Sequence, residues 1–267
     1  QEPVEILGPW PGDRLVVRTR YALGWIGADA PLSPPLGAEG AAFLAAERAH
    51  ASEALTLAGT PIPAGRQVAL QGEQAWVATA RGLQRTPAPP ELSPAARPLT
   101  RRALLEAAFA WLNTPYGWGG QGGGRDCSRL LMDLFARFGL ELPRYSGHQP
   151  HVASFVLDVA KVEDEGAKQR LIDAAQARGV VLLHFPGHIM LYLGRDAAGT
   201  PMALHSFAEY LEPCPADVTT HNPKRETLRR VHKVTVSDLE LGRGTSRRAF
   251  IERVTHIAVL GGDPGPG

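Results

Sequence analysis

The stretch YGWGGQGGGRDCSRLLMDLFARFGLELPRYS, residues 116–146, decides the fold of the region around it. A glycine-rich approach ends in Asp-Cys-Ser, and apolar residues then recur at helical spacing. These residues are Leu130, Leu131, Leu134, Phe135 and Phe138, and they line one face of a predicted helix. Gly139 is placed to end that helix, with a proline beyond it. Cys127 therefore lies where a loop enters a helix.

This position predicts that Cys127 is a nucleophile. Unpaired N–H groups and the positive dipole end of a helix favour a thiolate, which is the nucleophilic form. Such a thiolate is expected to react with iodoacetamide well below about pH 8. The alternative is a buried core cysteine. Cys214 has no activating neighbour in sequence and is interpreted as structural. A chain this long needs no disulfide staple, so we expect Cys127 to be reduced.

The composition narrows the function classes. The chain has 267 residues, with Lys+Arg 28 against Asp+Glu 27. It has no basic stripe or polybasic segment, so neither nucleic acid nor an anionic membrane is an expected partner. No apolar run approaches the roughly 18 residues of a transmembrane helix, so no integral membrane segment is expected. The chain opens without Met or a signal peptide, and we interpret it as a mature or trimmed product.

The order of predicted elements indicates two parts. Short strand-like runs at 14–26, 67–70 and 75–78 suit small antiparallel barrels, and the Ala-rich stretch 38–57 favours a short helix. The proline-rich run Thr86–Pro94 predicts a stiff linker. Helices are then expected over 100–112, with Thr100 as N-cap, and over 166–177. Strands follow at 180–183, 188–193, 202–207, 229–236 and 252–260. Helices followed by an antiparallel sheet indicate an α+β fold.

Two of the nine histidines are candidates for the base that accepts the proton of Cys127 and for the group that orients this base. A cysteine nucleophile needs an imidazole that takes its proton and returns it to the leaving amine. His188 and His205 flank a loop over 194–201 that suits a hairpin. If the hairpin folds about its middle, paired residue numbers sum to about 395 and the two rings are diagonal neighbours on one face. One ring then acts as base while the other orients it. The alternative is that either is an ordinary sheet histidine.

A metal centre is the weaker interpretation of the histidines. His184 and His188 have the spacing of a ligand pair. No third ligand follows at a convincing spacing, and the chain has no HExxH motif. We therefore expect no metal and no cofactor.

These residues resemble the NlpC/P60 family of cell-wall cysteine peptidases. The matching pieces are Tyr-Gly-Trp-Gly-Gly from Tyr116, Asp-Cys-Ser at 126–128, Leu-Pro-Arg-Tyr-Ser ending at Ser146, and Gly-His at 187–188. The resemblance implies a papain-like core, in which the cysteine helix packs on an antiparallel sheet. By position, it implies a catalytic triad of Cys127, His188 and His205. Arg129 departs from the family's usual Gly, and either covers the cleft or contacts a substrate carboxylate.

The resemblance also implies a domain plan. The catalytic domain spans 100–262, after a proline-rich linker over 91–99 and before a tail over 263–267. The preceding part resembles bacterial SH3-like (SH3b) modules, with an incomplete first module over 1–34 and a second over 35–90. The overall expectation is therefore an α+β peptidase domain preceded by small all-β SH3-like barrels.

Members with this layout cut the bond between γ-D-Glu and a diamino acid in peptidoglycan stem peptides, and they select short peptides with free N-terminal L-Ala. The implied substrate-binding residues are Tyr116, Trp118, Asp126, Ser128 and Ser146. A carboxylate at position 126 suits a substrate ammonium, although it also suits an N-terminal helix cap.

Two other functions remain open at this point. The chain is either a catalytically inactive wall-binding protein, or an amidase or acyltransferase that uses the same Cys-His site. All of these imply peptidoglycan or murein peptides as partners, a periplasmic, cell-envelope or secreted location, and a monomer.

Overall fold

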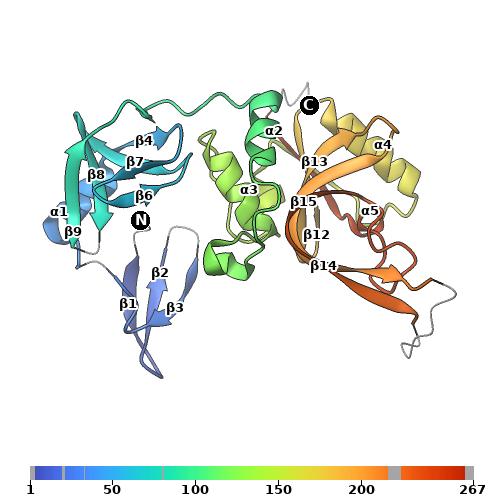
Figure 1. Ribbon diagram of the computed structural model, residues 1–267, viewed down its shortest axis with the longest axis horizontal. Helices are drawn as coiled ribbons and strands as arrows, with labels where there is room; N and C mark the ends of the chain where they lie inside the picture. Colours follow the sequence, from blue (N-terminus) through green and yellow to red (C-terminus); the bar gives the residue numbers. More distant parts are fainter. Residues whose placement is uncertain (1–3, 20–21, 33, 80, 216–223, 262–267) are drawn as a thin grey trace. The chain divides into compact units, whose positions relative to one another are not determined.

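A computed structural model gives the fold of the chain (Figure 1). The structure describes residues 4–19, 22–32, 34–79, 81–215 and 224–261. The chain divides into two compact units, which are considered one at a time. One comprises Gln1–Leu99 and Asp133–Glu141, and the other comprises Thr100–Met132 and Leu142–Gly267. The predicted tail over 263–267 lies outside the described residues.

The N-terminal part of the first unit is built mostly of antiparallel strands. Its elements are β1 (Glu5–Trp10), β2 (Arg14–Arg18), β3 (Leu23–Gly27), α1 (Gly37–Ala45), β4 (Glu47–Ala51), β5 (Leu55–Leu57), β6 (Thr60–Ile62), β7 (Gln67–Gln71), β8 (Gln74–Thr79), β9 (Gly82–Pro87) and β10 (Leu92–Ser93). The first three strands form a sheet in the order β1-β2-β3. A larger sheet has the order β10-β4-β7-β8-β9, and β5 pairs with β6. Whether these sheets amount to SH3-like barrels stays a prediction.

The helix predicted over 38–57 is shorter than expected. It ends at Ala45, and the chain continues as β4. Along β4 the side chains of Ala49 and Ala51 are buried in a core with Val68 and Val77, while the residues between are more exposed. This burial has a period of two, which is the period of a strand rather than a helix. The alanine content was therefore misleading, because small residues also suit a closely packed strand.

The proline-rich segment is not a free linker. β9 extends through Thr86 to Pro87, and β10 pairs with β4 through Leu92↔Ala51 and Ser93↔His50. Leu92 is buried in the core of the same sheet. The linker predicted over 91–99 thus contains a strand, and the second module predicted over 35–90 draws one of its strands from beyond residue 90. Both terminal strands of the sheet carry or adjoin prolines, as edge strands tolerate.

The second unit is organised around a six-stranded antiparallel sheet in the order β11-β16-β12-β13-β14-β15. Helix α3 begins in this unit, and its last residues belong to the first. The elements from residue 100 onward are α2 (Arg101–Phe109), η1 (Trp118–Gly123), α3 (Cys127–Ala136), η2 (Gln149–Val152), β11 (Phe155–Asp158), α4 (Glu165–Gln176), β12 (Val180–Phe185), β13 (His188–Arg195), β14 (Pro201–Pro213), β15 (Glu226–Asp238), α5 (Phe250–Arg253) and β16 (His256–Leu260).

Side chains are buried on both faces of the central strands. On one face, Leu183 and Met190 pack in a core that includes Ile172 of α4 and Phe250 of α5. The alternate residues, such as Ile189, are also fully buried and face the opposite side. In Figure 1, α2 and the start of α3 lie on that side of the sheet. Burial on two faces explains why β12 and β13 are nearly continuous apolar runs.

The predicted hairpin register is confirmed. Leu191 pairs with Leu204 and Tyr192 with Ala203, and both pairs of residue numbers sum to 395. A bulge between Tyr192 and Gly194 shifts the register by one toward the loop. Gly194 has a φ of 102°, a conformation that glycine adopts without strain.

The predicted helices are confirmed with small changes in bounds, while the last strand is shorter than predicted. Thr100 caps α2 through a hydrogen bond from the Ala103 N–H to its Oγ1 (3.2 Å). The strand predicted over 252–260 begins only at His256, because α5 occupies the residues before it. No helix within the described residues is long and apolar enough to cross a membrane.

We expect the Leu183→Ala variant to lose about 2–5 kcal/mol of unfolding free energy, because the truncation leaves a cavity in a fully buried position. Leu228→Ala is the matched control, since Leu228 lies in the same sheet but is 42% exposed. Its loss should stay within about 0.5 kcal/mol. Urea unfolding followed by circular dichroism measures both. Equal losses would contradict the assignment of the core.

Candidate active site

The glycine-rich approach to α3 is a compact loop that few other residues could form. Gly119, Gly120 and Gly122 have positive φ angles, which favour glycine. A Cβ on Gly117 would lie only 2.3 Å from the Gln121 carbonyl oxygen, and one on Gly124 only 2.7 Å from the Gly117 nitrogen. The backbone therefore folds closely onto itself immediately before the cysteine.

Asp126 caps the helix that Cys127 begins. Its Oδ1 accepts the Arg129 N–H at 2.9 Å, three residues on, which is the N-cap arrangement. Its Oδ2 accepts the Gly119 N–H at 2.9 Å, which joins the glycine loop to the helix start. Cys127 follows the cap as the first helical residue and is partly exposed.

A buried ion pair saturates the Asp126 carboxylate. The Arg144 guanidinium makes a two-pronged contact with both Asp126 oxygens, and its Nη1 also donates to Ser128 Oγ at 2.7 Å. Burial alone would raise the pKa of Asp126, but the bonds from Arg144, Arg129 and Gly119 outweigh it and lower the pKa. Asp126 therefore acts as a helix cap and as the partner of Arg144, rather than as a free carboxylate available to an ammonium.

The two predicted histidines are hydrogen-bonded to each other. His188 Nε2 lies 2.8 Å from His205 Nδ1, and both residues are buried. The His205 ring stacks on Phe207 with 4.3 Å between centroids, and both imidazoles contact Phe250. A direct hydrogen bond thus joins the two rings, while their roles as base and orienting group stay a prediction.

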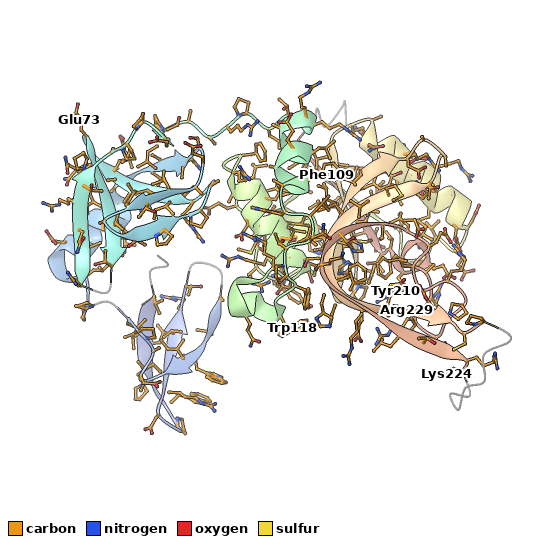
Figure 2. The ribbon with its side chains drawn as sticks, in the orientation of Figure 1. Glu73, Phe109, Trp118, Tyr210, Lys224 and Arg229 are labelled. Atoms are coloured by element: carbon orange, nitrogen blue, oxygen red, sulfur yellow. The ribbon has the colours of Figure 1, made fainter. Side chains whose placement is uncertain are left out.

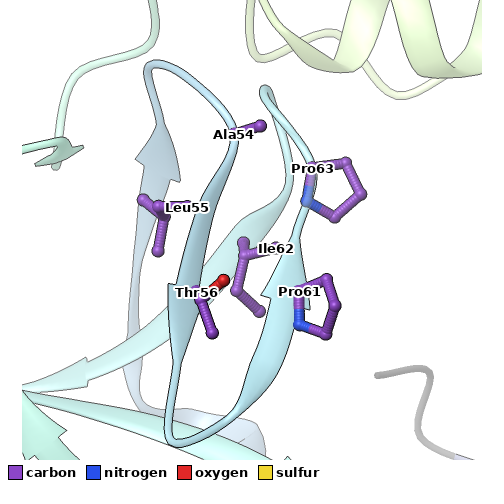
Figure 3. Close-up of a pocket in the computed structure, with 6 residues that line it drawn as sticks. All are labelled: Ala54, Leu55, Thr56, Pro61, Ile62 and Pro63. Atoms are coloured by element: carbon purple, nitrogen blue, oxygen red, sulfur yellow. The ribbon is translucent and has the colours of Figure 1, made fainter.

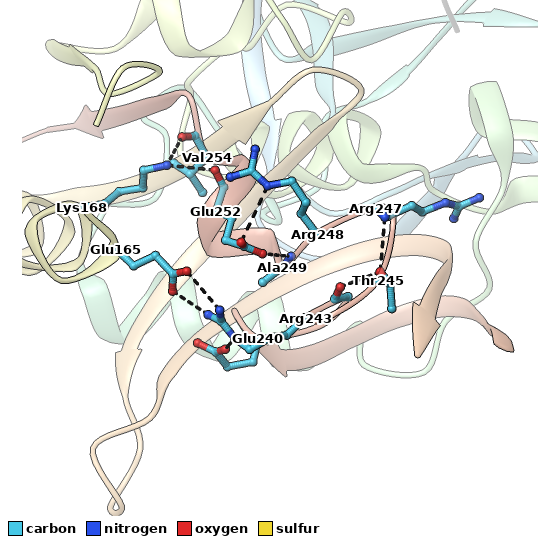
Figure 4. Close-up of polar contacts among 11 residues, drawn as sticks. Glu165, Lys168, Glu240, Arg243, Thr245, Arg247, Arg248, Ala249, Glu252 and Val254 are labelled. Carbon is cyan, nitrogen blue, oxygen red and sulfur yellow. Dashed lines mark hydrogen bonds and ion pairs between the residues drawn. The ribbon is translucent and has the colours of Figure 1, made fainter. Parts of the chain in front are cut away.

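A lysine holds the helix that covers these rings. Lys168 of α4 is 3% exposed, and its Nζ donates to the carbonyl oxygens of Glu252 and Val254 at the end of α5 (Figure 4). These carbonyls have no helical partner of their own, so the cation satisfies them. Phe250 is kept against the histidines as a result.

Cys127 lies beside the backbone of the strand that carries His188. The backbone N–H groups of Ile189, the residue after His188, and of Ser128 are close enough to the sulfur to lower its pKa. Among the described residues, the hydrogen bonds do not include a direct one between the thiol and the His188 ring. The catalytic pairing of Cys127 with His188 therefore stays a proposal.

The resting charge states differ from the sequence expectation. Burial raises the pKa of the Cys127 thiol, although the Ile189 and Ser128 N–H groups oppose the effect. Burial lowers the pKa of His188 to about 3, and it also lowers that of His205. The predicted low-pKa thiolate is therefore wrong for this resting structure, because desolvation of the sulfur outweighs the helix start. Thiol and imidazole both rest in their neutral forms near pH 7.

The remaining predicted site residues differ in their surroundings. Burial, and then the nearby Cys127 and Asp126 side chains, raise the pKa of Tyr116. Tyr116 packs edge-on against His232, with 6.1 Å between ring centroids. Trp118 is 73% exposed on the glycine loop and is labelled in Figure 2. Ser146 is buried in the segment after Arg144. Only Asp126 and Ser128 contact each other directly, at 3.3 Å.

Sequence reasoning missed three polar residues of this region. Arg144 stood within the family run ending at Ser146, but nothing in the sequence indicated its partner. Gln149 is fully buried, and its Nε2 donates to the carbonyls of Ser128 and Pro143. Ser237 Oγ lies 2.9 Å from His205 Nε2 and comes from a strand 32 residues further along the chain. The pairing register of β14 with β15 is the one signal that could have pointed to Ser237.

A second histidine group includes His184, which contributes to the lowered pKa of His188. The His256 ring contacts those of His151 and His184, with centroids 5.7 Å and 5.6 Å away. Burial, and then the two other histidines, lower the pKa of His184 to about 4. Within the described chain, no three His, Cys, Asp or Glu residues are arranged to hold a metal ion.

A hollow in the first unit is an unsuitable reaction site. It lies against the β5–β6 hairpin (Figure 3). Its lining residues are Ala54, Leu55, Thr56, Pro61, Ile62 and Pro63. A threonine hydroxyl is the one polar side-chain group among them, so these side chains supply no general base. Cys127 with the histidine pair is therefore the candidate active site.

Comparison with known proteins identifies this region. Residues 113–214 match the model of the NlpC/P60 family. They form an NlpC/P60 family domain. The domain contains Cys127, His188 and His205, whereas Ser237 lies beyond the matched residues. No curated protein matches the chain.

Two solved structures share the fold. An NlpC/P60 endopeptidase from Photobacterium damselae subsp. piscicida has a TM-score of 0.63 at 16% identity, and the match covers 93% of this chain and 60% of that one. An NlpC/P60 family protein from Bacillus cereus has a TM-score of 0.57 at 14% identity, covering 96% and 78%. The chain thus spans little more than half of the first protein's length. At these identities the likeness concerns the fold alone.

The thiol pKa predicts the pH dependence of alkylation. In a Cys214→Ser background, the rate of Cys127 labelling by iodoacetamide should rise with a midpoint above the ordinary thiol value of about 8.5. A raised pKa keeps the thiolate fraction low until a higher pH is reached. The same chain unfolded in urea is the control and should show the ordinary midpoint. A folded midpoint at or below the unfolded one would indicate a thiolate–imidazolium pair instead.

Removing Arg144, the partner of Asp126, should lower the stability of the fold. Arg144→Met is expected to lower the unfolding free energy by about 3–5 kcal/mol, because it leaves a buried carboxylate without its cationic partner. The loss should be smaller in an Asp126→Asn background, since Asn keeps the helix cap without the charge. The pKa of Asp126 is lowered on folding, so its stabilising effect is present above its unfolded value of about 3.9 and fades as the pH falls through the folded value. Urea unfolding at neutral and acidic pH tests both points, and equal losses in the two backgrounds would contradict them.

Proposed function

We propose that the chain is a cysteine peptidase that hydrolyses the bond between γ-D-Glu and a diamino acid in peptidoglycan stem peptides. The observation that carries the proposal is the hydrogen-bonded His188–His205 pair, with His188 on a strand whose Ile189 N–H lowers the pKa of the Cys127 thiol, within residues that match the NlpC/P60 model. A nucleophile, a base and an orienting group are the components of covalent acyl transfer. Short peptides with free N-terminal L-Ala are the proposed substrates.

The neutral resting states suggest how the reaction begins. As the Cys127 sulfur attacks the γ-carbonyl carbon, its proton passes to the unprotonated nitrogen of His188. The C–N bond then breaks, and His188 returns that proton to the leaving amine. A water molecule attacks the resulting thioester while His188 takes its proton. The C–S bond then breaks to release the acid product, and His188 returns that proton to the leaving sulfur. Each step leaves the proton count unchanged.

Two features support stabilisation of the charges that form. The N–H group of Cys127, at the start of α3, has no partner within the helix and suits an oxyanion. His205 contacts the ring that becomes an imidazolium. Because His188 rests with a low pKa, the developing negative charge on sulfur and oxygen is what makes its protonation favourable.

The proposed recognition of the peptide differs in one respect from the sequence hypothesis. The Asp126 carboxylate already accepts bonds from Arg144, Gly119, Arg129 and Ser128. A substrate ammonium bound there would have to replace one of these donors. We therefore propose that Tyr116, Trp118, Ser128 and Ser146 line the peptide site while Asp126 maintains its frame. A cell-envelope, periplasmic or secreted location and a monomeric state complete the proposal.

Replacing the nucleophile tests the assignment. Cys127→Ala and Cys127→Ser should lower the release of diamino acid from L-Ala-γ-D-Glu-diamino acid by several orders of magnitude. Mass analysis of the products measures the release, and Cys214→Ser is the matched control that should retain wild-type turnover. Undiminished turnover in Cys127→Ala would rule out the proposed mechanism.

The same assay separates the other functions. Whole sacculi offered in parallel should yield fewer products than the free tripeptide if short peptides are the substrates. Cleavage at the sugar–peptide link would indicate an amidase, and a transferred acyl group an acyltransferase. Binding of sacculi by the wild type without any product would indicate a wall-binding protein.

A further inference from the structure

Ser237 on β15 makes two hydrogen-bond contacts with one hydroxyl group. Its Oγ lies 2.9 Å from Nε2 of His205 and 2.8 Å from the carbonyl oxygen of Asp238. A carbonyl oxygen can only accept, and a hydroxyl has a single hydrogen to donate. Both contacts are hydrogen bonds only if the Ser237 hydrogen goes to Asp238 and the oxygen accepts from His205.

This assignment fixes the protons on both rings. His205 then carries its proton on Nε2, so its Nδ1 is an acceptor. The 2.8 Å contact between His205 Nδ1 and His188 Nε2 requires the proton of His188 on Nε2. Nδ1 of His188 is therefore unprotonated. The opposite direction would place the His188 proton on Nδ1 and leave that nitrogen unable to act as a base.

We infer that Ser237 is a positioning residue, which sets the tautomers of His205 and His188 so that Nδ1 of His188 is the nitrogen that accepts the Cys127 proton. The catalytic part of this inference rests on the proposed function. The tautomer part rests only on the contacts of Ser237, His205 and His188.

The strand register explains why a residue this distant serves the pair. In the β14–β15 ladder His205 pairs with Thr235, and Ala203 pairs with Ser237. Side chains two positions apart on one strand face the same side, so Ser237 is the diagonal neighbour of His205. The long ring of His205 spans this diagonal, while the shorter Thr235 Oγ1 bonds instead to the Val236 carbonyl at 3.3 Å.

Packing holds both imidazole rings in the orientation that these hydrogen bonds require. His205 is fully buried between Phe207, which stacks on it, and the edge of Phe250. His188 contacts Phe185 and Phe250. A flip of either ring would put carbon atoms where its nitrogens lie and break the hydrogen bond between the two rings, so the aromatic contacts and the Ser237 bond act together. Because burial lowers the pKa of both histidines, each ring holds one proton near pH 7 and the tautomer is well defined.

The experiment compares Ser237→Ala with Thr235→Val, which removes a hydroxyl from the same face of the same strand, opposite His205. Imidazole 15N chemical shifts of 15N-histidine-labelled protein, recorded without substrate, report which nitrogen of each ring carries the proton. In the wild type and in Thr235→Val, both Nδ1 atoms should be unprotonated. In Ser237→Ala, a fraction of each ring should carry its proton on Nδ1. Ser237→Thr retains the hydroxyl and should restore the wild-type shifts.

Kinetics with the tripeptide provide a second readout. Ser237→Ala should lower kcat on the order of 10-fold with little change in KM, as part of the roughly 10²- to 10⁴-fold effect of general-base catalysis. A protonated Nδ1 on His188 in the wild type, or unchanged shifts in Ser237→Ala, would overturn the inference. If the shifts behave as expected but the wild type cleaves no peptide, the proposed function fails while the tautomer assignment stands. A fall in kcat without any change in the shifts would also count against it, because Ser237 would then act by another route.

Discussion

The hydrogen bond between the buried rings of His188 and His205 is the interaction on which the candidate site depends. It requires the strand pairing that makes the two residues diagonal neighbours, and it requires an apolar surrounding in which both rings stay neutral. Phe250 supplies part of that surrounding, and Lys168 holds the short helix that carries it. The sheet, α4 and α5 therefore together set the surroundings of these two side chains.

The start of α3 shows a second balance of forces. A helix N-terminus and two backbone N–H groups favour negative charge on the Cys127 sulfur, yet burial favours the neutral thiol and outweighs them. The adjacent Asp126 is the opposite case, because the Arg144 guanidinium and backbone donors overcome its burial. Two adjacent residues thus differ in charge state: the Cys127 thiol is neutral and the Asp126 carboxylate is ionised. The difference comes from how many donors each side chain receives.

Much of this arrangement could be predicted from local sequence. The helix of Cys127 follows from its apolar spacing, and the pairing of His188 with His205 follows from a polar loop midway between two strands. Contacts between distant segments could not be read in the same way. Arg144 reaches Asp126 across 18 residues, and Ser237 reaches His205 across 32, through chain paths that no periodicity encodes. Composition also misled in two places. The alanines of the closely packed strand β4 favour a helix by their composition, and the prolines beside the edge strand β10 indicate a linker. The charge of Cys127 depends on how far the folded chain buries its sulfur, which no local pattern reveals.

The bulge between Tyr192 and Gly194 has an implication for the evolution of this hairpin. Changes in loop length around residues 196–200 can be absorbed where the register already slips, while the ladder on the other side of Tyr192 keeps its alignment. The length of the hairpin loop can therefore change without altering the strand pairing near His188 and His205. Insertions and deletions can accumulate at the tip in related chains without disturbing the His188–His205 hydrogen bond.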